Sequence, residues 1–301
     1  MDSCVFGAGS LGSLVGGLLA GDNDVTLVGR DPHISAVAED GLRVTGEFDR
    51  HVTPEARTTP PDRAELVVVT VKSFDTAKAA DALTACDADA VLSLQNGMGN
   101  EQQLARILDV PVLAGTCTYG ARLETPGTVA CTGLGEIVLG PHEGGQSALA
   151  DRVGSTFTAA GFEVTVASDM PRRLWEKLAV NAGINAVTAL ARVPNGALVD
   201  GPTREVAAAA ARETARVAQS QGVDLDAERA VERTLAVAEA TAANTSSMHQ
   251  DVLADARTEI DAINGYVLDC ADEPVPVNET LTRLVRGWED HRDHRDTDYC
   301  E

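Results

Sequence analysis

The chain has 301 residues, enough for one large or two ordinary domains, and its hydrophobic fraction of 44% supports a sizeable core and excludes wholesale disorder. Its 46 acidic residues outnumber 24 basic ones and its aromatic fraction is 3%, which excludes a nucleic-acid-binding protein, because that class needs basic and stacking side chains. No apolar run reaches the roughly 20 residues of a membrane span, and no basic leader precedes the first strand-like run, so we expect a cytoplasmic protein without membrane contact.

Strand and helix signals alternate through the first half of the chain. This rhythm predicts an α/β fold with a parallel, doubly wound Rossmann-type sheet. The stretch Val110–Gly140, rich in Thr and Gly, is expected to return as strands across the edge of that sheet. In chain order, we expect strands at Ser3–Phe6, Asp24–Val28, Ala64–Lys72, Ala90–Leu94 and Phe162–Val166, and helices at Leu11–Ala20, Phe74–Thr84, Glu101–Leu108 and Ala148–Ala160.

After the segment Ser168–Pro171 the pattern changes to Ala-rich helices with few strand signals. The sequence therefore predicts a dinucleotide-binding domain over residues 1–167 and an all-helical substrate domain over residues 168–301. The tail Trp288–Glu301 is highly charged and is expected to fray. In the second domain, the expected helices are Arg173–Ala191, Arg204–Gln221, Asp226–Ala242 and Met248–Leu268.

Lysine is nearly absent from the chain. Only Lys72, Lys78 and Lys177 occur, and the other 21 basic residues are arginine. A surface rich in Asp and Glu and poor in Lys is typical of adaptation to very high salt, where the Debye length falls to ~3 Å and self-repulsion costs little. Drift in a GC-rich genome is the alternative explanation. In either case, each remaining lysine is a candidate for a specific role.

The six cysteines are scattered and form no C-x-x-C pair. This distribution favours buried thiols in a reducing compartment over a disulfide framework or a zinc site. We therefore expect no metal ion.

A glycine-rich fingerprint joins the first expected strand to the first expected helix. The run Gly7-Ala8-Gly9-Ser10-Leu11-Gly12 fits G-x-G-x-x-G. The first glycine permits a tight turn, the second lets the backbone approach a pyrophosphate, and the third lets helix and strand pack closely. The helix N-terminus then faces the phosphates. These six residues are candidate ligands of a nicotinamide dinucleotide.

The end of the second strand bears on which dinucleotide is bound. The chain there reads Val28-Gly29-Arg30-Asp31. A guanidinium at Arg30 suits the 2′-phosphate of NADP, whereas an acid suits the 2′-hydroxyl of NAD. Arg30 favours NADPH as the cofactor, and Asp31 leaves NAD open.

Lys177, Asn181 and Asn185 follow one another at a spacing of four among apolar residues. This spacing places them on one face of a helix, within ~80° of one another. One ammonium group and two carboxamides suit an oxygen-rich substrate, and the lysine can polarise a ketone and supply a proton as hydride arrives. The alternative is a lysine that reaches solvent beside two structural amides.

A serine pair and a glutamate mark the last expected helix. Ser246 and Ser247 suit its N-cap. On a continuous helix, Glu259 lies about 60° from the centre of the apolar stripe, which predicts a half-buried border position. Glu259 is therefore a further candidate site residue.

Together these segments resemble the ketopantoate reductase family. The resemblance runs from the fingerprint to about Leu268, and its most specific parts are Trp175–Asn181 and the segment from Ser246 to Gly265. It implies that Lys177 gives the proton to the forming hydroxyl and that Glu259 lies beside the substrate and the nicotinamide ribose. It also implies substrate contacts by Asn181, Asn185, Asn195, Asn244, Ser247 and Asn96, and cofactor contacts by the fingerprint, Arg30, Lys72, Asn96, Ala121 and Glu259.

The resemblance implies an NADPH-dependent reduction of 2-dehydropantoate to (R)-pantoate, a step towards pantothenate and coenzyme A. The partner would be a small keto acid, and a homodimer is compatible with the family. Two alternatives stay open: a related dehydrogenase acting on another 2-keto acid or an opine, and a non-catalytic dinucleotide-binding redox sensor. The nucleotide-binding half fits all three, so only the Lys–Asn and Ser–Glu segments favour the reductase.

Overall fold

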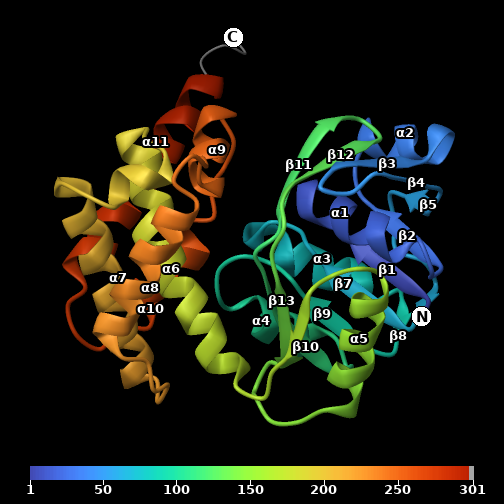
Figure 1. Cartoon of the computed structure of the whole chain (residues 1–301), viewed down its shortest axis with the longest axis horizontal. Helices are drawn as coiled ribbons and strands as arrows, with labels where there is room; N and C mark the ends of the chain where they lie inside the picture. Colours follow the sequence, from blue (N-terminus) through green and yellow to red (C-terminus); the bar gives the residue numbers. More distant parts are fainter. Residues whose placement is uncertain (298–301) are drawn as a thin grey trace. The chain divides into compact units, whose positions relative to one another are not determined.

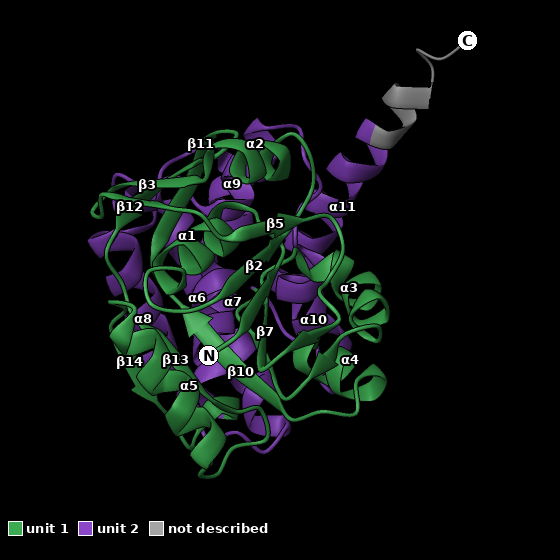
Figure 2. Ribbon diagram, turned by 90° about the vertical axis from the view of Figure 1, so that its right-hand side faces the viewer, with its two compact units in different colours: residues 1–95, 99–171 green, residues 96–98, 172–301 purple. Residues whose placement is uncertain are grey.

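The computed structural model describes residues 1–297 of the chain, with side chains through residue 292. Cys300 and the last residues of the charged tail lie outside the described residues. The chain divides into two compact units, coloured separately in Figure 2. Unit 1 comprises Met1–Gln95 and Gly99–Pro171, and unit 2 comprises Asn96–Met98 and Arg172–Glu301. Residues Asn96–Met98, which lie in the first half of the chain, therefore belong to the second unit.

Unit 1 is built on a central sheet whose strand order is β14-β13-β10-β9-β7-β1-β2-β5 (Figure 1). Its neighbouring strands run parallel except for the antiparallel pair of β10 and β13. This parallel-rich order confirms the Rossmann-type prediction. The strands are β1 (Ser3–Phe6), β2 (Val25–Val28), β5 (Glu55–Arg57), β7 (Leu66–Val69), β9 (Val91–Ser93), β10 (Val112–Cys117), β13 (Ile137–Pro141) and β14 (Val164–Val166).

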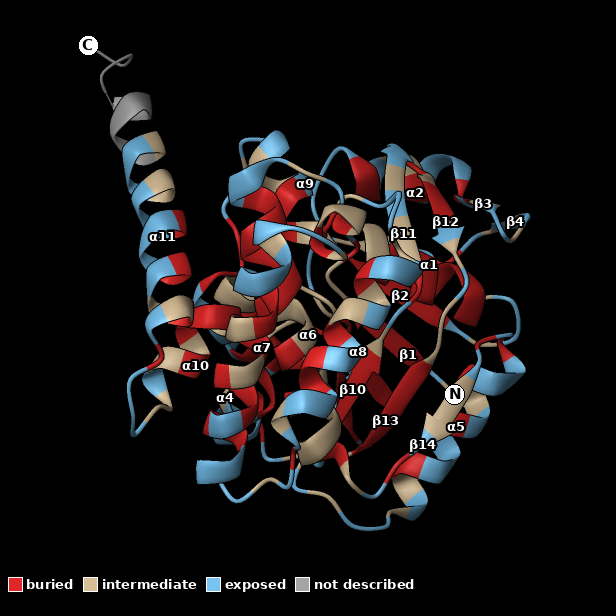
Figure 3. Cartoon of the chain, turned by 60° about the vertical axis from the view of Figure 1, so that its left-hand side comes forward, coloured by how far each residue is buried: buried red, intermediate tan, exposed pale blue. Residues whose placement is uncertain are grey.

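The central strands are apolar on both faces because helices cover both faces of the sheet. Alternate residues of one strand enter different cores: Val5 packs in a cluster with helices α1 (Ser10–Leu19) and α5 (Ala148–Ala159), and its neighbour Cys4 packs in another. That second cluster includes residues of α3 (Thr76–Leu83) and α4 (Asn100–Ile107). Figure 3 shows β10 and β13 as buried. The near-continuous β-branched runs of the sequence are therefore explained by two-sided burial.

A second sheet of order β11-β12-β3-β4 covers the outer side of α1. Of the strands expected where Val110–Gly140 returns across the edge of the main sheet, β10 and β13 lie in that sheet, whereas β11 and β12 pair in the second sheet. Helix α1 can be enclosed by two sheets because it carries adjacent glycines: a Cβ at Gly16 would meet Leu27, and one at Gly17 would meet Val44. The strands are β3 (Leu42–Gly46), β4 (Arg50–Val52), β11 (Gly120–Thr125) and β12 (Thr128–Gly133).

Four short elements complete the described part of unit 1. Helix α2 (His33–Asp40) follows the second strand, and the short 3-10 helix η1 (Ser73–Asp75) leads into α3. Strands β6 (Arg63–Ala64) and β8 (Asp87–Ala88) pair as a small parallel sheet.

Among the residues that the structure describes, unit 2 contains helices and no strand, as the Ala-rich sequence predicts. Small residues let its helices approach closely: a Cβ at Gly183 would lie 2.9 Å from the carbonyl oxygen of Ala207. The elements are α6 (Met170–Ala191), η2 (Asn195–Leu198), α7 (Pro202–Ser220), α8 (Ala227–Ala240), α9 (Ser247–Leu253), the π-helical turn η3 (Asp261–Gly265), α10 (Tyr266–Asp269) and α11 (Pro276–Thr297).

The expected continuous helix Met248–Leu268 is wrong. Helix α9 ends at Leu253, and Asp255 adopts a left-handed φ of +52° that a helix interior does not allow. A non-helical segment then leads to the π-turn η3. No glycine or proline marks this break, so the sequence shows no ordinary helix-stop signal there.

The expected fraying of the charged tail from Trp288 onward is also wrong for the described part, because α11 continues to Thr297. Its polar face forms ion pairs with η3 and the segment before it: Arg286 Nε lies 2.7 Å from Oδ1 of Asp261, the first residue of η3, and Arg292 Nε lies 2.9 Å from Asp255 Oδ1. The N-terminus of α11 is held by the buried Glu213, whose carboxylate accepts hydrogen bonds from the N–H groups of Val277 and Asn278. Some of the charged residues of α11 therefore stabilise the fold through ion pairs.

Candidate functional site

The first glycine of the fingerprint shapes the turn between β1 and α1. Gly7 has a φ of +115°, and its N–H donates to the carbonyl oxygen of Val28 at 2.8 Å. A Cβ at Gly7 would lie 2.7 Å from the backbone N of Val71, so a larger residue does not fit. The turn therefore lies between the ends of β2 and β7, at the carboxyl edge of the sheet where open α/β folds bind their ligands.

The second glycine leaves open space beside this turn. A Cβ on Gly9 would meet only the carbonyl oxygen of Gly7, at 3.9 Å. Gly9 is also the N-cap of α1, and no side chain caps that helix end. An uncapped helix start offers N–H groups and the positive end of the helix dipole to an anion. The local structure thus fits the pyrophosphate of a dinucleotide.

Ser10 and Ala121 connect the turn to the second sheet. Ser10 Oγ accepts a hydrogen bond from the N–H of Leu123 at 3.1 Å, which leaves its own proton to be donated elsewhere. Ala121 lies on the same strand, β11, as Leu123. Both expected cofactor residues are therefore near the start of α1.

The ends of β2 and β7 bring Arg30 and Lys72 to either side of the turn. A Cβ on Gly29 would lie 2.8 Å from the Cβ of Ala8, so the backbone before Arg30 packs directly on the fingerprint. On the other side, Val71 packs on Gly7, and Lys72 follows it as the N-cap of η1. The structure thus places both residues at the same edge as the glycines.

Two acids lie near Arg30, and they have different partners. The Asp31 carboxylate accepts hydrogen bonds from the N–H and the hydroxyl of Ser35, in the first turn of α2. Asp75, at the end of η1, is the residue that pairs with Arg30: its Oδ2 lies 3.3 Å from Arg30 Nη2. Sequence reasoning missed Asp75, because 45 residues separate the partners and no motif connects them.

In unit 2, Lys177, Asn181 and Asn185 lie on α6 with the predicted one-turn spacing. Lys177 and Asn181 are half-buried, and Asn185 is buried. Asn185 Nδ2 donates to Ser247 Oγ at 3.4 Å, which joins two of the expected substrate residues.

The serine pair attaches the start of α9 to α6. Ser246 is the N-cap of α9, as expected, and its Oγ accepts from the N–H of His249 at 3.2 Å. The same oxygen lies 2.7 Å from Thr188 Oγ1 on α6. Ser247 is therefore held beside Asn185 by its neighbour.

Asn195 and Asn244 are joined through the backbone. The N–H of Asn195 donates to the carbonyl oxygen of Asn244 at 3.0 Å, and Asn195 Nδ2 donates to Thr241 Oγ1 at 2.9 Å. Asn195 Oδ1 is buried without a hydrogen-bond partner among the described residues, whereas Asn244 is exposed. The Asn195 side chain is thus anchored at one end only.

Glu259 is 5% exposed, so the expected half-buried border position is wrong. The expectation assumed a continuous helix, and Glu259 instead lies in the non-helical segment before η3. Asn96 belongs to the same unit as Glu259. The two residues that follow Asn96 contact η3, since the N–H of Met98 donates to the carbonyl oxygen of Ala262 at 2.9 Å and Gly97 packs on Ala262.

The expected site residues thus divide between the units. The fingerprint, Arg30, Lys72 and Ala121 lie in unit 1, where they gather around one turn. Unit 2 carries the other expected residues, among which Asn185 contacts Ser247 and Asn195 contacts Asn244. Those in unit 2 are Asn96, Lys177, Asn181, Asn185, Asn195, Asn244, Ser247 and Glu259.

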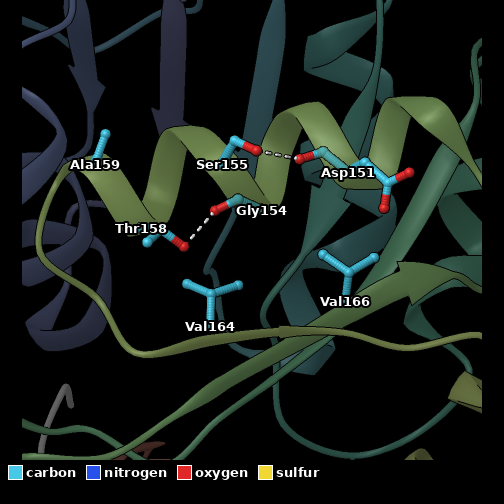
Figure 4. Close-up of a pocket in the computed structure, with 7 residues that line it drawn as sticks. All are labelled: Asp151, Gly154, Ser155, Thr158, Ala159, Val164 and Val166. Carbon is cyan, nitrogen blue, oxygen red and sulfur yellow. Dashed lines mark hydrogen bonds between the residues drawn. The ribbon is translucent and has the colours of Figure 1, made fainter.

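A surface hollow between α5 and β14 contains none of these residues (Figure 4). It is lined by Asp151, Gly154, Ser155, Thr158, Ala159, Val164 and Val166.

Among residues 1–297 no group of three or more His, Cys, Asp or Glu side chains is arranged to hold a metal ion. Within the same part of the chain, no helix combines the length and apolarity needed to cross a bilayer. Burial raises the pKa of the Cys4 thiol to about 12, with Cys86 nearby contributing, so this thiol stays protonated inside the sheet.

A glycine-rich turn on a parallel-rich sheet, followed by a helical unit with lysine, asparagine and glutamate side chains, defines the class of two-unit oxidoreductases with a Rossmann-type sheet. Two family models match the chain: "Ketopantoate reductase PanE/ApbA" over residues 3–144 and "Ketopantoate reductase PanE/ApbA C terminal" over residues 169–289. The chain belongs to the PanE/ApbA ketopantoate reductase family.

Curated relatives extend along nearly the whole chain. The 2-dehydropantoate 2-reductase of Halobacterium salinarum is 47% identical, covering 94% of this chain and 97% of that protein. The 2-dehydropantoate 2-reductase of Archaeoglobus fulgidus is 42% identical, covering 95% and 97%. The Halobacterium relative fits the salt-adapted composition of the chain.

Solved structures share the fold. A PanE/ApbA family ketopantoate reductase from Ralstonia eutropha superposes with a TM-score of 0.88 at 34% identity, covering 98% of this chain and 100% of that one. D-mandelate dehydrogenase, solved with NADH and anilino(oxo)acetate, has a TM-score of 0.90 at 24% identity, covering 97% and 99%. The latter likeness concerns the fold alone.

Proposed function

We propose that the chain reduces 2-dehydropantoate to (R)-pantoate with NADPH, in the cytoplasm, as a step towards pantothenate and coenzyme A. The single observation that carries this proposal is the joining of the α6 polar face to the serine pair through Asn185 and Ser247, in a chain of the ketopantoate reductase family. Lysine, carboxamide and hydroxyl groups on this scaffold suit a small keto acid.

In this proposal unit 1 binds the dinucleotide. The open space at Gly9 and the uncapped start of α1 accommodate the pyrophosphate, with Ser10 donating its hydroxyl proton. Arg30 supports NADPH over NADH, because its guanidinium suits a 2′-phosphate and the Asp31 carboxylate is engaged with Ser35. Bound reduced nicotinamide supplies the hydride to the ketone carbon.

The residues of unit 2 orient the substrate and handle the proton. Ser247 Oγ accepts from Asn185, so its own proton is left to bind the substrate carboxylate. Lys177 stabilises the developing alkoxide and protonates it, while the buried Glu259 holds the substrate hydroxyl and the ammonium group in place. Asn181, Asn195, Asn244 and Asn96 complete the polar lining.

A spectrophotometric assay of NADPH oxidation with ketopantoate tests the proposal, run from low to molar KCl because the composition is salt-adapted. Pyruvate, other 2-keto acids and opine precursors serve as control substrates. We expect ketopantoate to give the highest kcat/KM. Faster turnover of another keto acid would favour the related dehydrogenase, and dinucleotide binding without turnover of any substrate would favour the redox sensor.

A further inference from the structure

Asp75 holds the arginine that faces the ribose end of the proposed dinucleotide site. Its Oδ2 lies 3.3 Å from Arg30 Nη2, and its Oδ1 lies 3.7 Å from Lys78 Nζ on α3. The Arg30 side chain is 90% exposed, whereas that of Asp75 is 22% exposed. Asp75 is also fixed by its backbone, since its N–H donates to the carbonyl oxygen of Lys72 at 2.9 Å. The carboxylate is therefore the fixed member of the pair and the guanidinium the adjustable one.

The surroundings of Asp75 are unusually basic for this protein. The chain has only three lysines, and two of them, Lys72 and Lys78, lie within three residues of Asp75 in the sequence. Arg30 and Lys78 put two cations within 4 Å of one carboxylate in a chain of net charge −22, and the backbone carbonyl of Lys72 accepts from the N–H of Asp75. The nearest other acid in the Arg30 loop, Asp31, is engaged with Ser35. Such a cluster of cations suits an anionic ligand, and the Asp75 carboxylate already neutralises part of its positive charge.

We propose that Asp75 is a specificity-determining residue that lowers the preference for a 2′-phosphorylated dinucleotide by competing for Arg30. The inference rests on the proposed function, which supplies the dinucleotide. A 2′-phosphate that contacts Arg30 brings about two negative charges close to the Asp75 carboxylate. A 2′-hydroxyl is neutral and can donate a hydrogen bond to the same carboxylate. The Asp75 carboxylate therefore weakens the binding of a dinucleotide with a 2′-phosphate and permits the binding of one with a free 2′-hydroxyl.

Coulomb's law gives the size of this effect. For a dianion roughly 7 Å from a carboxylate, an effective dielectric constant of about 30, between the values for a protein surface and for water, and screening over about one Debye length near 0.2 M give a repulsion that weakens binding roughly 5- to 10-fold. Lys78 has the opposite influence, because it shares the Asp75 carboxylate and adds a positive charge near the phosphate. Salt screens both effects, since the Debye length falls from ~7 Å near 0.2 M to ~2 Å near 2 M.

Asp75→Asn is the sharpest substitution, because Asn keeps the shape and an oxygen that can accept from Arg30 while losing the charge. Asp81→Asn is the matched control: Asp81 is exposed on α3, the helix that directly follows Asp75, and its substitution changes the net charge equally. Lys78→Gln provides an independent variant of opposite sign. Thermal unfolding confirms that each variant is folded.

The experiment is a titration of each protein with NADPH and with NADH, followed by fluorescence, at about 0.2 M and about 2 M KCl. For Asp75→Asn we expect the ratio of the NADH to the NADPH dissociation constant to rise 5- to 10-fold at the lower salt, with most of this gain lost at the higher salt. Asp81→Asn should change the ratio less than twofold, and Lys78→Gln should lower it.

An unchanged or lower ratio for Asp75→Asn, or an equal rise for Asp81→Asn, would overturn the inference while leaving the proposed function intact. Failure of the unmodified protein to bind either dinucleotide would overturn both. Because the measurement is of binding, neither outcome depends on the identity of the keto acid.

Discussion

Glu289 accepts two hydrogen bonds from Thr258, one from the backbone N–H and one from the hydroxyl, both at 2.7 Å. Glu289 lies on α11, within the charged tail, and Thr258 directly precedes Glu259. Thr258 is 3% exposed, so its N–H has no access to water as a substitute partner. The C-terminal helix thus holds the segment that presents the candidate glutamate.

Glu289→Ala should lower the free energy of unfolding by about 1–3 kcal/mol, because it leaves a buried N–H and a buried hydroxyl without their acceptor. It should also raise the KM for ketopantoate, since the Glu259 segment loses its support, and leave the KM for NADPH unchanged. Chemical denaturation and steady-state kinetics measure these effects. Glu289→Gln keeps an acceptor oxygen and is the control; an equal loss in both variants would contradict the role of the two hydrogen bonds.

Lys177→Ala should lower kcat by roughly 10²–10⁴ while the variant still binds NADPH, because the proton donor is lost and the fingerprint is untouched. Lys177→Arg keeps the positive charge but gives up a proton far less readily, so its kcat should also fall. Single-turnover NADPH oxidation with ketopantoate measures the chemical step. A near-normal kcat in the alanine variant would refute the assigned role.

Gly9→Val and Gly7→Ala should fail in different ways. A side chain at Gly9 enters open space, so the variant should fold normally but lose dinucleotide binding. At Gly7 a Cβ would clash with the backbone of Val71 at a φ of +115°, so that variant should lose stability, with strain of about 1–3 kcal/mol. Thermal unfolding and NADPH titration distinguish the two; retained NADPH affinity in Gly9→Val would place the pyrophosphate elsewhere.

His33 should make stability depend on pH. The buried ring accepts from the N–H of Gly127 through Nδ1 at 3.1 Å, so it carries its proton on Nε2 and donates it to Ser13 Oγ at 2.9 Å. Burial lowers the pKa of His33 below its ordinary value of 6.5. The folded protein therefore keeps this ring neutral while the unfolded chain binds a proton, so its contribution to stability is complete above pH 6.5 and declines below it.

Accordingly, His33→Gln should be less stable than the unmodified protein by about 1–3 kcal/mol at pH 8, and the difference should narrow by pH 5. Urea unfolding at several pH values measures it. Ser13→Ala keeps the imidazole and loses one hydrogen bond, so its stability curve should run parallel to that of the unmodified protein. A His33→Gln difference that stays constant with pH would contradict this account.

The elements that periodicity predicted correctly are mostly those in which the pattern of buried residues is visible within one short stretch of sequence. The strand expected over Ala64–Lys72 and the helix expected over Arg173–Ala191 correspond to β7 (Leu66–Val69) and α6 (Met170–Ala191), because two-sided burial and an apolar pattern are visible in a single window. The fingerprint residues were found for the same reason, since all of their geometry is local. The residues of α6 carry the expected spacing because a helix converts spacing directly into a face.

The errors arise where distant residues decide the conformation. The break after Leu253 has no local stop signal, and Glu289 and Arg286 from α11 hold the segment that follows and the start of η3. The charged tail was expected to fray because its partners lie elsewhere in the chain. Asp75 was missed for the same reason, because its role depends on the ion pair with Arg30 and no sequence pattern connects the two residues.

The transfer of Asn96–Met98 to unit 2 has a consequence for dissecting the protein. The polypeptide passes from one unit to the other after Gln95, after Met98 and after Pro171. A gene fragment that begins at Arg172 would therefore encode an incomplete second unit, without the glycine that packs on Ala262 and the N–H that bonds to its carbonyl. Neither unit corresponds to one uninterrupted stretch of chain, so a single proteolytic cut cannot release either of them whole.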